Sequence, residues 1–210
     1  VPPLGAMDTT LCMGASISAL HGYNKVLGAE SAKRSIAVIG DSTFMHSGMT
    51  GLVNITYNQG ISTVMILDNS ITGMTGHQDN PCTGKTLKGE KVYGILPENI
   101  CRAAGIAPEH IRIVDPFNLE ETERVIREEL EAPVPSVIIA RRPCALLKYV
   151  KRGEPLVVNT AKCVGCKACM KIGCPAISVV DKKARIDATL CTGCNLCRQL
   201  CRPGAIGAAQ

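Results

Sequence analysis

The residues with the most specific chemistry are eight of the twelve cysteines, which fall inside 39 residues near the end of the chain. They form two runs with gaps of two residues, Cys163, Cys166, Cys169 and Cys174, then Cys191, Cys194, Cys197 and Cys201. Three thiolates at that spacing can wrap three irons of a cubane cluster, and in proteins with two such clusters the fourth ligand comes from the other run. The spacing therefore predicts two [4Fe-4S] clusters, one held by Cys163, Cys166, Cys169 and Cys201, the other by Cys191, Cys194, Cys197 and Cys174.

The first run departs from the usual spacing, because four residues rather than three precede its last cysteine. The extra residue changes a loop and leaves both sets of four thiols complete. A pair of structural zinc sites is the alternative, but a CxxCxxC run that occurs twice is more typical of iron–sulfur clusters. Since the 60 residues after position 150 contain few large apolar side chains, we expect them to need inorganic crosslinks and to unfold when iron is removed.

A second group of candidate ligands stands at the ends of two predicted strands. The apolar run 35–39 stops just before Asp41, and the run 63–67 stops just before Asn69. With a predicted helix over 47–59 between them, the unit reads strand, helix, strand, and the carboxyl ends of such strands are where open α/β sheets bind ligands. Carboxylate and amide oxygens suit Mg²⁺ that is shared with a phosphate group.

Other residues near this predicted edge could take part in binding. Ser47 is the expected N-cap of the helix, whose first amide groups could meet an anion. His46 beside it could assist proton transfer or hold substrate, and a structural role for this lone histidine stays open. The segment 71–81 is rich in turn formers and hydrogen-bonding side chains, so we interpret it as a binding loop. The segment 83–86 lacks the upstream glycine and strand of a P-loop, which excludes a nucleotide hydrolase.

Composition narrows the class of protein. The chain is 46% hydrophobic with only four Tyr and two Phe, which is compatible with an aliphatic globular core. No apolar run is long enough for a transmembrane helix, and the first residues lack the features of a secretion signal. The missing initiator Met suggests a fragment. Cysteines at metal-cluster spacing are typical of reducing compartments, so we expect a cytoplasmic protein.

Charge divides unevenly along the chain. Residues 1–150 carry 13 Lys and Arg against 15 Asp and Glu, a net −2, whereas residues 151–210 carry 10 against 3, a net +7, and the two add to +5. Much of the basic excess is expected to offset thiolates and cluster charge, and no aromatic residue follows Tyr149 to stack bases, which disfavours nucleic-acid binding. We expect two domains, 1–150 and 151–210, joined by a linker from Arg141 to about Pro155.

Alternating strand and helix signals predict a doubly wound, mainly parallel α/β sheet, followed by a small α+β, two-cluster ferredoxin-like C-terminal domain. Asn118 and Glu121 resemble a capping box at the start of an amphipathic helix. The further elements expected are a helix from about 12 to 27, a helix at 98–104, a strand at 111–114, a helix at 119–131 and a strand at 136–140.

The remaining cysteines and histidines receive no catalytic role. Cys12 is expected to be buried as a small apolar residue, because no Cys or His lies near it in sequence. The scattered thiols of Cys82, Cys101 and Cys144 are expected to be reduced. His21 and His110 have no setting that suggests a site.

These features together carry a resemblance to a known family. Gly40-Asp41-Ser42, with Asn69 placed 28 positions after Asp41, resembles the thiamine-diphosphate motif GDG followed by Asn, with Ser42 replacing the third glycine. The strings GDSTFMHSGMTGLVNITYNQG and LDNSITGMTGHQDNP, followed by the two-cluster tail, resemble the C-terminal part of the indolepyruvate ferredoxin oxidoreductase alpha subunit. The similarity spans almost all 210 residues.

The resemblance implies roles for the residues at the predicted sheet edge. Asp41 and Asn69 would bind Mg²⁺ through side-chain oxygens, with the main-chain carbonyl of Ile71, and Mg²⁺ would hold the diphosphate of thiamine diphosphate. His46 would face the reactive thiazolium end. The residues implied to line or shape the cradle are Gly40, Ser42, Gly73, Thr75 and Gly76.

The implied reaction is oxidative decarboxylation of an aryl 2-oxo acid such as indolepyruvate, with coenzyme A taking the acyl group and ferredoxin taking electrons. The cofactor supplies the carbon chemistry, and the clusters remove electrons one at a time. Such enzymes also need a pyrimidine-binding domain with an activating Glu, upstream or on a separate chain, and a small beta subunit, so this chain is expected to be inactive alone. Two alternatives stay open: an oxidoreductase for another 2-oxo acid such as pyruvate, or an electron-transfer or assembly subunit whose cofactor site has lapsed.

Overall fold

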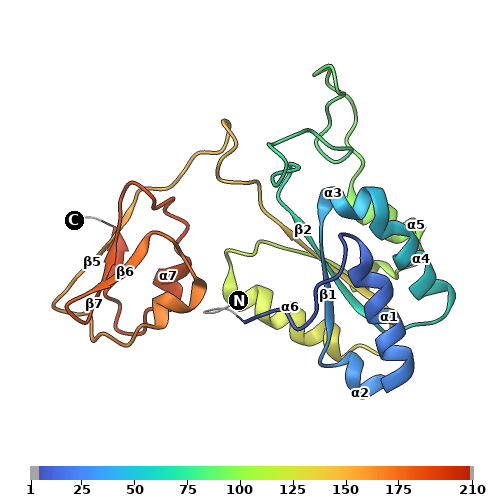
Figure 1. Cartoon of the computed structure of the whole chain (residues 1–210), viewed down its shortest axis with the longest axis horizontal. Coiled ribbons are helices and arrows are strands. Elements are labelled where there is room, and N and C mark those ends of the chain that lie inside the picture. The colour runs from blue at the N-terminus through green and yellow to red at the C-terminus, as the bar shows by residue number, and fades with distance from the viewer. Residues whose placement is uncertain (1–4, 209–210) are drawn as a thin grey trace. The chain divides into compact units, whose positions relative to one another are not determined.

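The computed structural model describes residues 5–208, which divide into two compact units (Figure 1). Residues 10–144 form the first, which we term the sheet unit. Residues 145–208, together with residues 5–9, form the second, which we term the cysteine unit. The units meet in sequence after Cys144, inside the predicted linker. Among the residues described, no helix is long and apolar enough to cross a membrane.

The sheet unit is built on four strands in the order β1-β2-β4-β3, with every neighbouring pair parallel. The strands are β1 (Ile36–Gly40), β2 (Thr63–Asp68), β3 (Ile111–Val114) and β4 (Ser136–Arg141). β2 and β4 lie in the middle, and their β-branched side chains are buried on both faces, as expected for a parallel sheet with covered faces. The predicted α/β class is confirmed.

Helices cover both faces of this sheet (Figure 1). On one face pack α1 (Ala15–Leu27), α4 (Met49–Tyr57) and α5 (Pro97–Ala103), whose buried Ile17, Leu52 and Cys101 share a core with Val64 and Ile139 of the strands. On the other face, α6 (Leu119–Glu131) buries Val125 against Val114 and Ile138. The unit also contains the short helix α2 (Ala29–Ala32) and a 3₁₀ turn, η2 (Pro108–His110).

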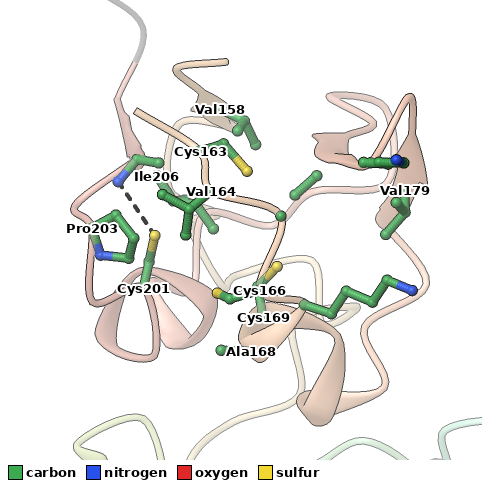
Figure 2. Close-up of a pocket in the computed structure, with 15 residues that line it drawn as sticks. Val158, Cys163, Val164, Cys166, Ala168, Cys169, Val179, Cys201, Pro203 and Ile206 are labelled. Carbon is green, nitrogen blue, oxygen red and sulfur yellow. Dashed lines mark hydrogen bonds between the residues drawn. The ribbon is translucent and has the colours of Figure 1, made fainter. Parts of the chain in front are cut away.

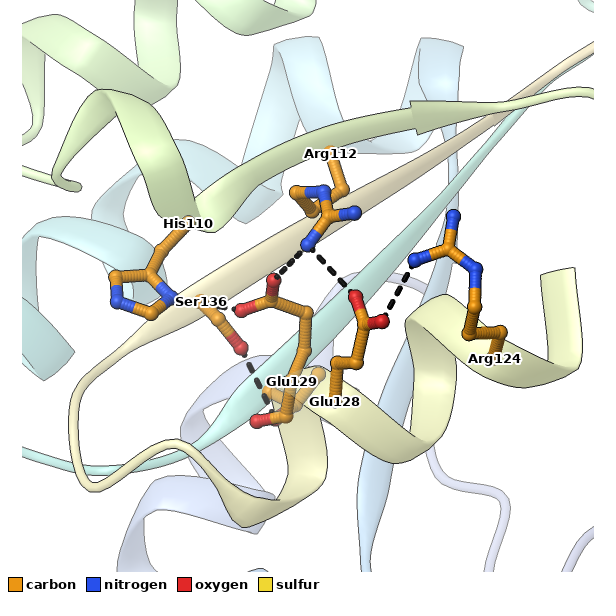
Figure 3. A network of polar contacts seen from close by, with 7 residues as sticks. His110, Arg112, Arg124, Glu128, Glu129 and Ser136 are labelled. Atoms are coloured by element: carbon orange, nitrogen blue, oxygen red, sulfur yellow. Dashed lines mark hydrogen bonds and ion pairs between the residues drawn. The ribbon is translucent and has the colours of Figure 1, made fainter. Parts of the chain in front are cut away.

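Polar contacts fix both ends of α6. At its start the Glu121 N–H donates to Asn118 Oδ1 at 3.2 Å, which confirms the predicted cap. Near its end the buried Glu129 carboxylate lies 2.8 Å from His110 Nδ1 and 3.0 Å from Arg112 Nη1 (Figure 3). These contacts attach the helix to β3 at the amino-terminal end of the sheet, so His110 has a structural setting.

The helix after β1 begins six residues earlier than predicted, at Asp41 instead of Ser47. α3 (Asp41–Thr43) continues without a break into a π-helical turn, η1 (Phe44–Gly48), and then into α4. Gly40 is the N-cap, and Ser47 instead donates from its Oγ to the Thr43 carbonyl inside the helix. The predicted N-cap was wrong because Phe44 is buried in the core and draws the preceding turn into the helix.

The cysteines outside the two runs are unpaired, as predicted. Cys101 is buried, and Cys82 and Cys144 are half-buried. The prediction for Cys12 was wrong, since this residue is exposed. It precedes α1, which begins only after Gly14 in a left-handed conformation (φ 94°), so Cys12 lies outside the helix that was expected to bury it.

The cysteine unit contains two small antiparallel sheets. β5 (Leu156–Val158) pairs with β8 (Ile206–Ala208), and β6 (Ile177–Val180) pairs with β7 (Lys183–Ile186). A 3₁₀ helix, η3 (Ala168–Ile172), and a short helix, α7 (Leu196–Gln199), follow the two cysteine loops. The main buried cluster of the described unit has three large aliphatic residues and two of the cysteines: Leu156, Ile177, Ile206, Cys169 and Cys197. Ala176 and Ala205 are buried as well.

Candidate cofactor and cluster sites

The carboxyl ends of β1 and β2 bring two carboxylates to the same level of the sheet. Gly40 pairs with Leu67 in the parallel register, so the next residues, Asp41 and Asp68, follow side by side. Both are buried, and Asn69 comes directly after Asp68. The register therefore places Asp41 and Asn69, the two residues predicted to hold Mg²⁺, just after the carboxyl ends of adjacent strands.

The Asp41 carboxylate has an unsatisfied oxygen. Only 2% of the residue is exposed, and Oδ2 has no hydrogen-bond partner in the part of the chain that the structure describes. Burial raises the pKa of this carboxyl, and the charge of neighbouring Asp68 raises it further. A buried carboxylate oxygen without a partner is costly unless a cation compensates it. Its oxygen chemistry fits Mg²⁺.

The turn after β2 is held from both sides. The Ile71 N–H donates to Asn69 Oδ1 at 3.1 Å, and Ser70 between them has a left-handed backbone (φ 61°). From the segment after β4, the Cys144 N–H donates to the Asn69 carbonyl at 2.9 Å, and the Arg142 N–H donates to the Asp68 carbonyl at 2.9 Å. The backbone that presents Asn69 is therefore an extension of the β2–β4 pairing.

Arg141, the last residue of β4, was not singled out from the sequence. Its Nε donates to Asp68 Oδ2 at 2.6 Å, and its two terminal nitrogens bind the carboxylate of Glu98 on α5 at 3.1 and 2.6 Å. Burial opposes ionisation of Glu98, but the Arg141 hydrogen bonds outweigh it and hold the pKa of that carboxyl below its usual range. The only signal in the sequence was an arginine ending an otherwise apolar strand.

A chain of side-chain hydrogen bonds connects the loop after β2 to the start of α3. Thr72 Oγ1 donates to Ser42 Oγ at 2.9 Å, and Asn80 Nδ2 donates to Thr72 Oγ1 at 3.3 Å. Thr72 and Asn80 were not named individually, although both fall in the predicted binding loop 71–81. Through these bonds the loop is anchored next to Asp41.

Three of the predicted cradle residues, Gly73, Thr75 and Gly76, belong to the same loop. Thr72 and Gln78 form an isolated antiparallel bridge, so the residues between them make a tight turn, and Gly76 within it has φ 112°. Thr75 is exposed and donates from Oγ1 to Gln78 Oε1 at 2.6 Å. Gly73 lies beside Asn69, because a Cβ on it would be 3.6 Å from Asn69 Nδ2. Thr75 and Gly76 form an exposed tip.

His46 lies in the π-helical turn η1, and its side chain is exposed. Single π-helical turns occur frequently at functional sites. The start of α1 meets the same turn, since a Cβ on Gly14 would lie only 2.1 Å from Ser47 Oγ. A side chain at position 14 would collide with the Ser47 side chain, and the left-handed φ of 94° also favours glycine there. The role of His46 stays a prediction.

The first predicted set of cluster ligands lines one hollow of the cysteine unit (Figure 2). Cys163, Cys166, Cys169 and Cys201 surround a space of about 420 Å³ that includes open solvent. Within residues 5–208 no three His, Cys, Asp or Glu side chains form a group that could hold a single metal ion. The four thiols instead surround a volume, which is the arrangement that a polynuclear cluster needs.

The second predicted set also comes together. Burial, together with the nearby thiols of Cys194, Cys191 and Cys174, raises the pKa of Cys197 to about 11. The pKa of Cys169 is raised in the same way, first by burial and then by Cys201, Cys166 and Cys163. Each buried cysteine is thus surrounded by the three others of its predicted set, where bound iron would stabilise the thiolates.

The two cysteine loops repeat one backbone conformation. Gly165 and Gly193 have φ 71° and 67°, and Lys167 and Asn195, two residues later, have φ 60° and 63°. The extra residue of the first run is accommodated after η3, where Gly173 adopts a left-handed backbone with φ 62°. The amides of Ala205 and Leu156 donate to Cys201 Sγ at 3.3 Å and to Cys191 Sγ at 3.5 Å. Amide hydrogen bonds of this kind tune cluster potentials.

Comparison with known proteins matches a family model to each unit of the chain. Residues 2–140 match the model of the thiamine pyrophosphate enzyme C-terminal TPP binding domain, and residues 155–202 match a 4Fe-4S dicluster domain. The chain is 41% identical to indolepyruvate oxidoreductase subunit IorA of Pyrococcus horikoshii, over 98% of this chain and 34% of that protein. It is 39% identical to the subunit of the same name from Archaeoglobus fulgidus, over 99% of this chain and 33% of that protein.

Among solved structures, a 2-oxoglutarate:ferredoxin oxidoreductase from Magnetococcus marinus overlaps 62% of this chain and 48% of its own, with 15% identity and a TM-score of 0.47. That likeness is too weak to bear on function. The chain spans about a third of the length of the curated relatives it matches. The family resemblance expected from the sequence is confirmed: the chain belongs to the thiamine pyrophosphate enzymes, through their C-terminal TPP-binding domain, and a 4Fe-4S dicluster domain follows it.

Proposed function

We propose that this chain is the cofactor-binding and electron-transferring part of a 2-oxo acid:ferredoxin oxidoreductase that acts on aryl 2-oxo acids such as indolepyruvate. One observation supports this most directly. A single chain joins a TPP-binding domain, with an unpartnered carboxylate oxygen on Asp41, to a unit in which two sets of four thiols are grouped. A simple decarboxylase has no use for the second unit.

In this proposal the sheet unit holds the diphosphate end of thiamine diphosphate. Asp41 and Asn69 bind Mg²⁺ through side-chain oxygens, with the main-chain carbonyl of Ile71. His46 faces the reactive thiazolium end, where it assists proton transfer or holds the substrate. When bound, the cofactor stabilises the negative charge left on the substrate as CO₂ departs. The residues that shape its cradle are Gly40, Ser42, Gly73, Thr75 and Gly76.

The reaction balances as a two-electron oxidation. A 2-oxo acid and coenzyme A give an acyl-CoA thioester, CO₂, one proton and two electrons. The electrons pass singly through the two clusters of the cysteine unit to ferredoxin, because each cluster carries one electron at a time. Pyruvate and other 2-oxo acids use the same chemistry, so the substrate side chain is the specific part of this proposal.

The proposal requires further protein. A pyrimidine-binding domain with an activating Glu comes from elsewhere in the subunit or from a separate chain, and a small beta subunit completes the assembly. Without them the chain is inactive, and we place the assembly in the reducing cytoplasm, which suits its unpaired cysteines. The proposed reaction and assembly involve no nucleic acid and no membrane.

The test is an anaerobic assay of the complete assembly with a panel of 2-oxo acids, following ferredoxin reduction with and without coenzyme A. We expect turnover with indolepyruvate and other aryl 2-oxo acids above that with pyruvate. A preference for pyruvate would mean that pyruvate, and not an aryl 2-oxo acid, is the substrate. No turnover with any 2-oxo acid would favour a subunit whose cofactor site has lapsed. Calorimetry with thiamine diphosphate and Mg²⁺ separates these outcomes: binding that Asp41→Ala removes supports the cofactor site, and equal binding by both proteins contradicts it.

A further inference from the structure

The two cysteine loops share a backbone conformation but not an environment. The loop between Cys191 and Cys194 is covered by the segment that enters the unit: the Gly153 N–H donates to the Thr192 carbonyl at 3.0 Å, and a Cβ on Gly193 would lie 2.5 Å from the Gly153 carbonyl carbon. That backbone contact places protein directly over the second loop.

The equivalent loop of the first set is open. Val164, which occupies the position of Thr192, is 69% exposed, and the ligand Cys166 is exposed where its counterpart Cys194 is half-buried. Val179, from β6, lines the same hollow and is 37% exposed (Figure 2). Within the described unit, the loop 163–166 is therefore open to solvent on an apolar side, whereas backbone covers the equivalent loop 191–194. Leu190 is 54% exposed, but it precedes Cys191 and lies outside that loop.

Cations surround this open loop. Lys162 precedes Cys163, and Lys167 and Lys182 line the hollow; all three are exposed and none forms an ion pair among the residues described. Asp181, next to Lys182, is the acidic residue of the same turn. Residues 151–210 contain ten Lys and Arg against three Asp and Glu, so these lysines stand in a strongly positive unit.

Compensation of cluster charge does not account for all of these lysines. Lys183 is explained by the first cysteine run itself, since its side chain is half-buried and its Nζ donates to the Cys163 carbonyl. Lys162, Lys167 and Lys182 are solvated instead. Exposed cations around an exposed apolar residue are the features that steer and seat an oppositely charged protein in a weak, transient encounter.

We propose that an acidic electron-carrier protein docks over the loop 163–166, with Val164 at the centre and Lys162, Lys167 and Lys182 around it, and that electrons leave through the cluster of Cys163, Cys166, Cys169 and Cys201. Each encounter oxidises that cluster by one electron and reduces the carrier by one, with no bond made or broken. The electron source is the 2-oxo acid oxidation, so this inference rests on the proposed function.

The test compares two double variants of the complete assembly with equal net charge. Lys162→Glu with Lys182→Glu reverses two charges at the open loop, and Lys151→Glu with Arg198→Glu reverses two elsewhere in the same unit. The carrier is a recombinant acidic two-cluster ferredoxin, and a zwitterionic viologen serves as a small acceptor without net charge. At low ionic strength we expect kcat/KM for ferredoxin to fall about 10-fold in the first double variant and less than about 2-fold in the second.

Salt and direct binding give independent readouts. The difference between the variants should disappear near 0.5 M salt, because the screening length then falls to roughly 4 Å. Binding to immobilised ferredoxin should weaken in parallel, while iron content and viologen reduction stay at wild-type values. Equal losses in both double variants would show that only net charge matters and would overturn the docking site, and so would no loss in either.

Failure of the proposed function gives a different pattern. If the wild-type assembly reduces neither viologen nor ferredoxin with any 2-oxo acid, the reaction is wrong. The binding measurement still decides the surface in that case, since it needs no turnover. Unequal binding by the two double variants would then support an acidic partner at this loop, and equal binding would refute it.

Discussion

Arg141 and Asp68 form a short ion pair between the last residues of the two central strands, with Arg141 Nε 2.6 Å from Asp68 Oδ2. Asp41, at the matching position on the neighbouring strand, has no such cation, and its Oδ2 is without a partner among the described residues. Two aspartates that look alike in the sequence therefore have opposite electrostatic settings. The charge of Asp68 is compensated by Arg141, whereas no cation pairs with Asp41 among the described residues.

The first prediction follows from that contrast. Asp41→Asn should make the cofactor-free protein more stable at neutral pH, by about 1–3 kcal/mol, because it removes a buried charge whose Oδ2 has no hydrogen-bond partner among the described residues. The sign follows from the raised pKa of Asp41: the unfolded chain loses this proton first, so the stability of the folded state falls as pH rises through the folded pKa. Thermal unfolding without cofactor measures the gain, and calorimetry should show that Mg²⁺-dependent binding of thiamine diphosphate is lost.

Asp68→Asn is the matched control for that experiment. It makes the same chemical change one strand away, but it removes a charged partner of Arg141. We expect a loss of about 2 kcal/mol. If both variants moved the unfolding temperature in the same direction, the assignment of one carboxylate to a cation site and the other to an ion pair would be wrong.

The second prediction concerns the glycines of the cysteine loops. A Cβ on Gly165 would lie 2.4 Å from the Lys182 carbonyl oxygen, and the residue has φ 71°. Gly204 has a similar φ of 63°, but a Cβ there would have nothing within 4 Å. Gly204→Ala should cost about 1 kcal/mol for its left-handed backbone alone. Gly165→Ala should cost more and lower the iron content, because the loop must move away from the β6–β7 turn.

Iron and sulfide analysis with thermal unfolding distinguishes the two glycine variants. Equal iron contents and equal unfolding temperatures would mean that backbone conformation, and not the close contact with Lys182, determines the loop. A lower iron content in Gly165→Ala alone would show that the loop position is required for the cluster.

The third prediction concerns removal of iron. Besides its cysteines, the described part of the cysteine unit buries three large aliphatic residues, Leu156, Ile177 and Ile206, and two alanines. That core is too small to hold about 60 residues without crosslinks. Chelation under reducing conditions should therefore abolish amide protection in residues 156–208 while β2 and β4 of the sheet unit stay protected. Hydrogen exchange of the holo and chelated chains measures this. Full protection of β5–β8 after chelation would contradict the prediction.

Much of the fold was predictable because its signals are local. The four strands of the sheet unit begin and end within a residue or two of their predicted limits, and the N-cap of α6 is the predicted Asn118. The start of the helix after β1 was not predictable, since the burial of Phe44, and not the capping propensity of Ser47, decides it. Cys12 was misplaced because a left-handed Gly14 separates it from α1.

The ligand types of both candidate sites could be predicted because each lies in a short stretch: cysteines two residues apart, and polar residues that follow apolar strands. Which charges are compensated depends on contacts between distant segments. Arg141 reaches Asp68 and Glu98 across 73 and 43 residues of chain, and Gly153 covers one of two nearly identical loops. Such contacts join segments that are far apart in the sequence. They depend on strand register and side-chain packing, and not on local propensity.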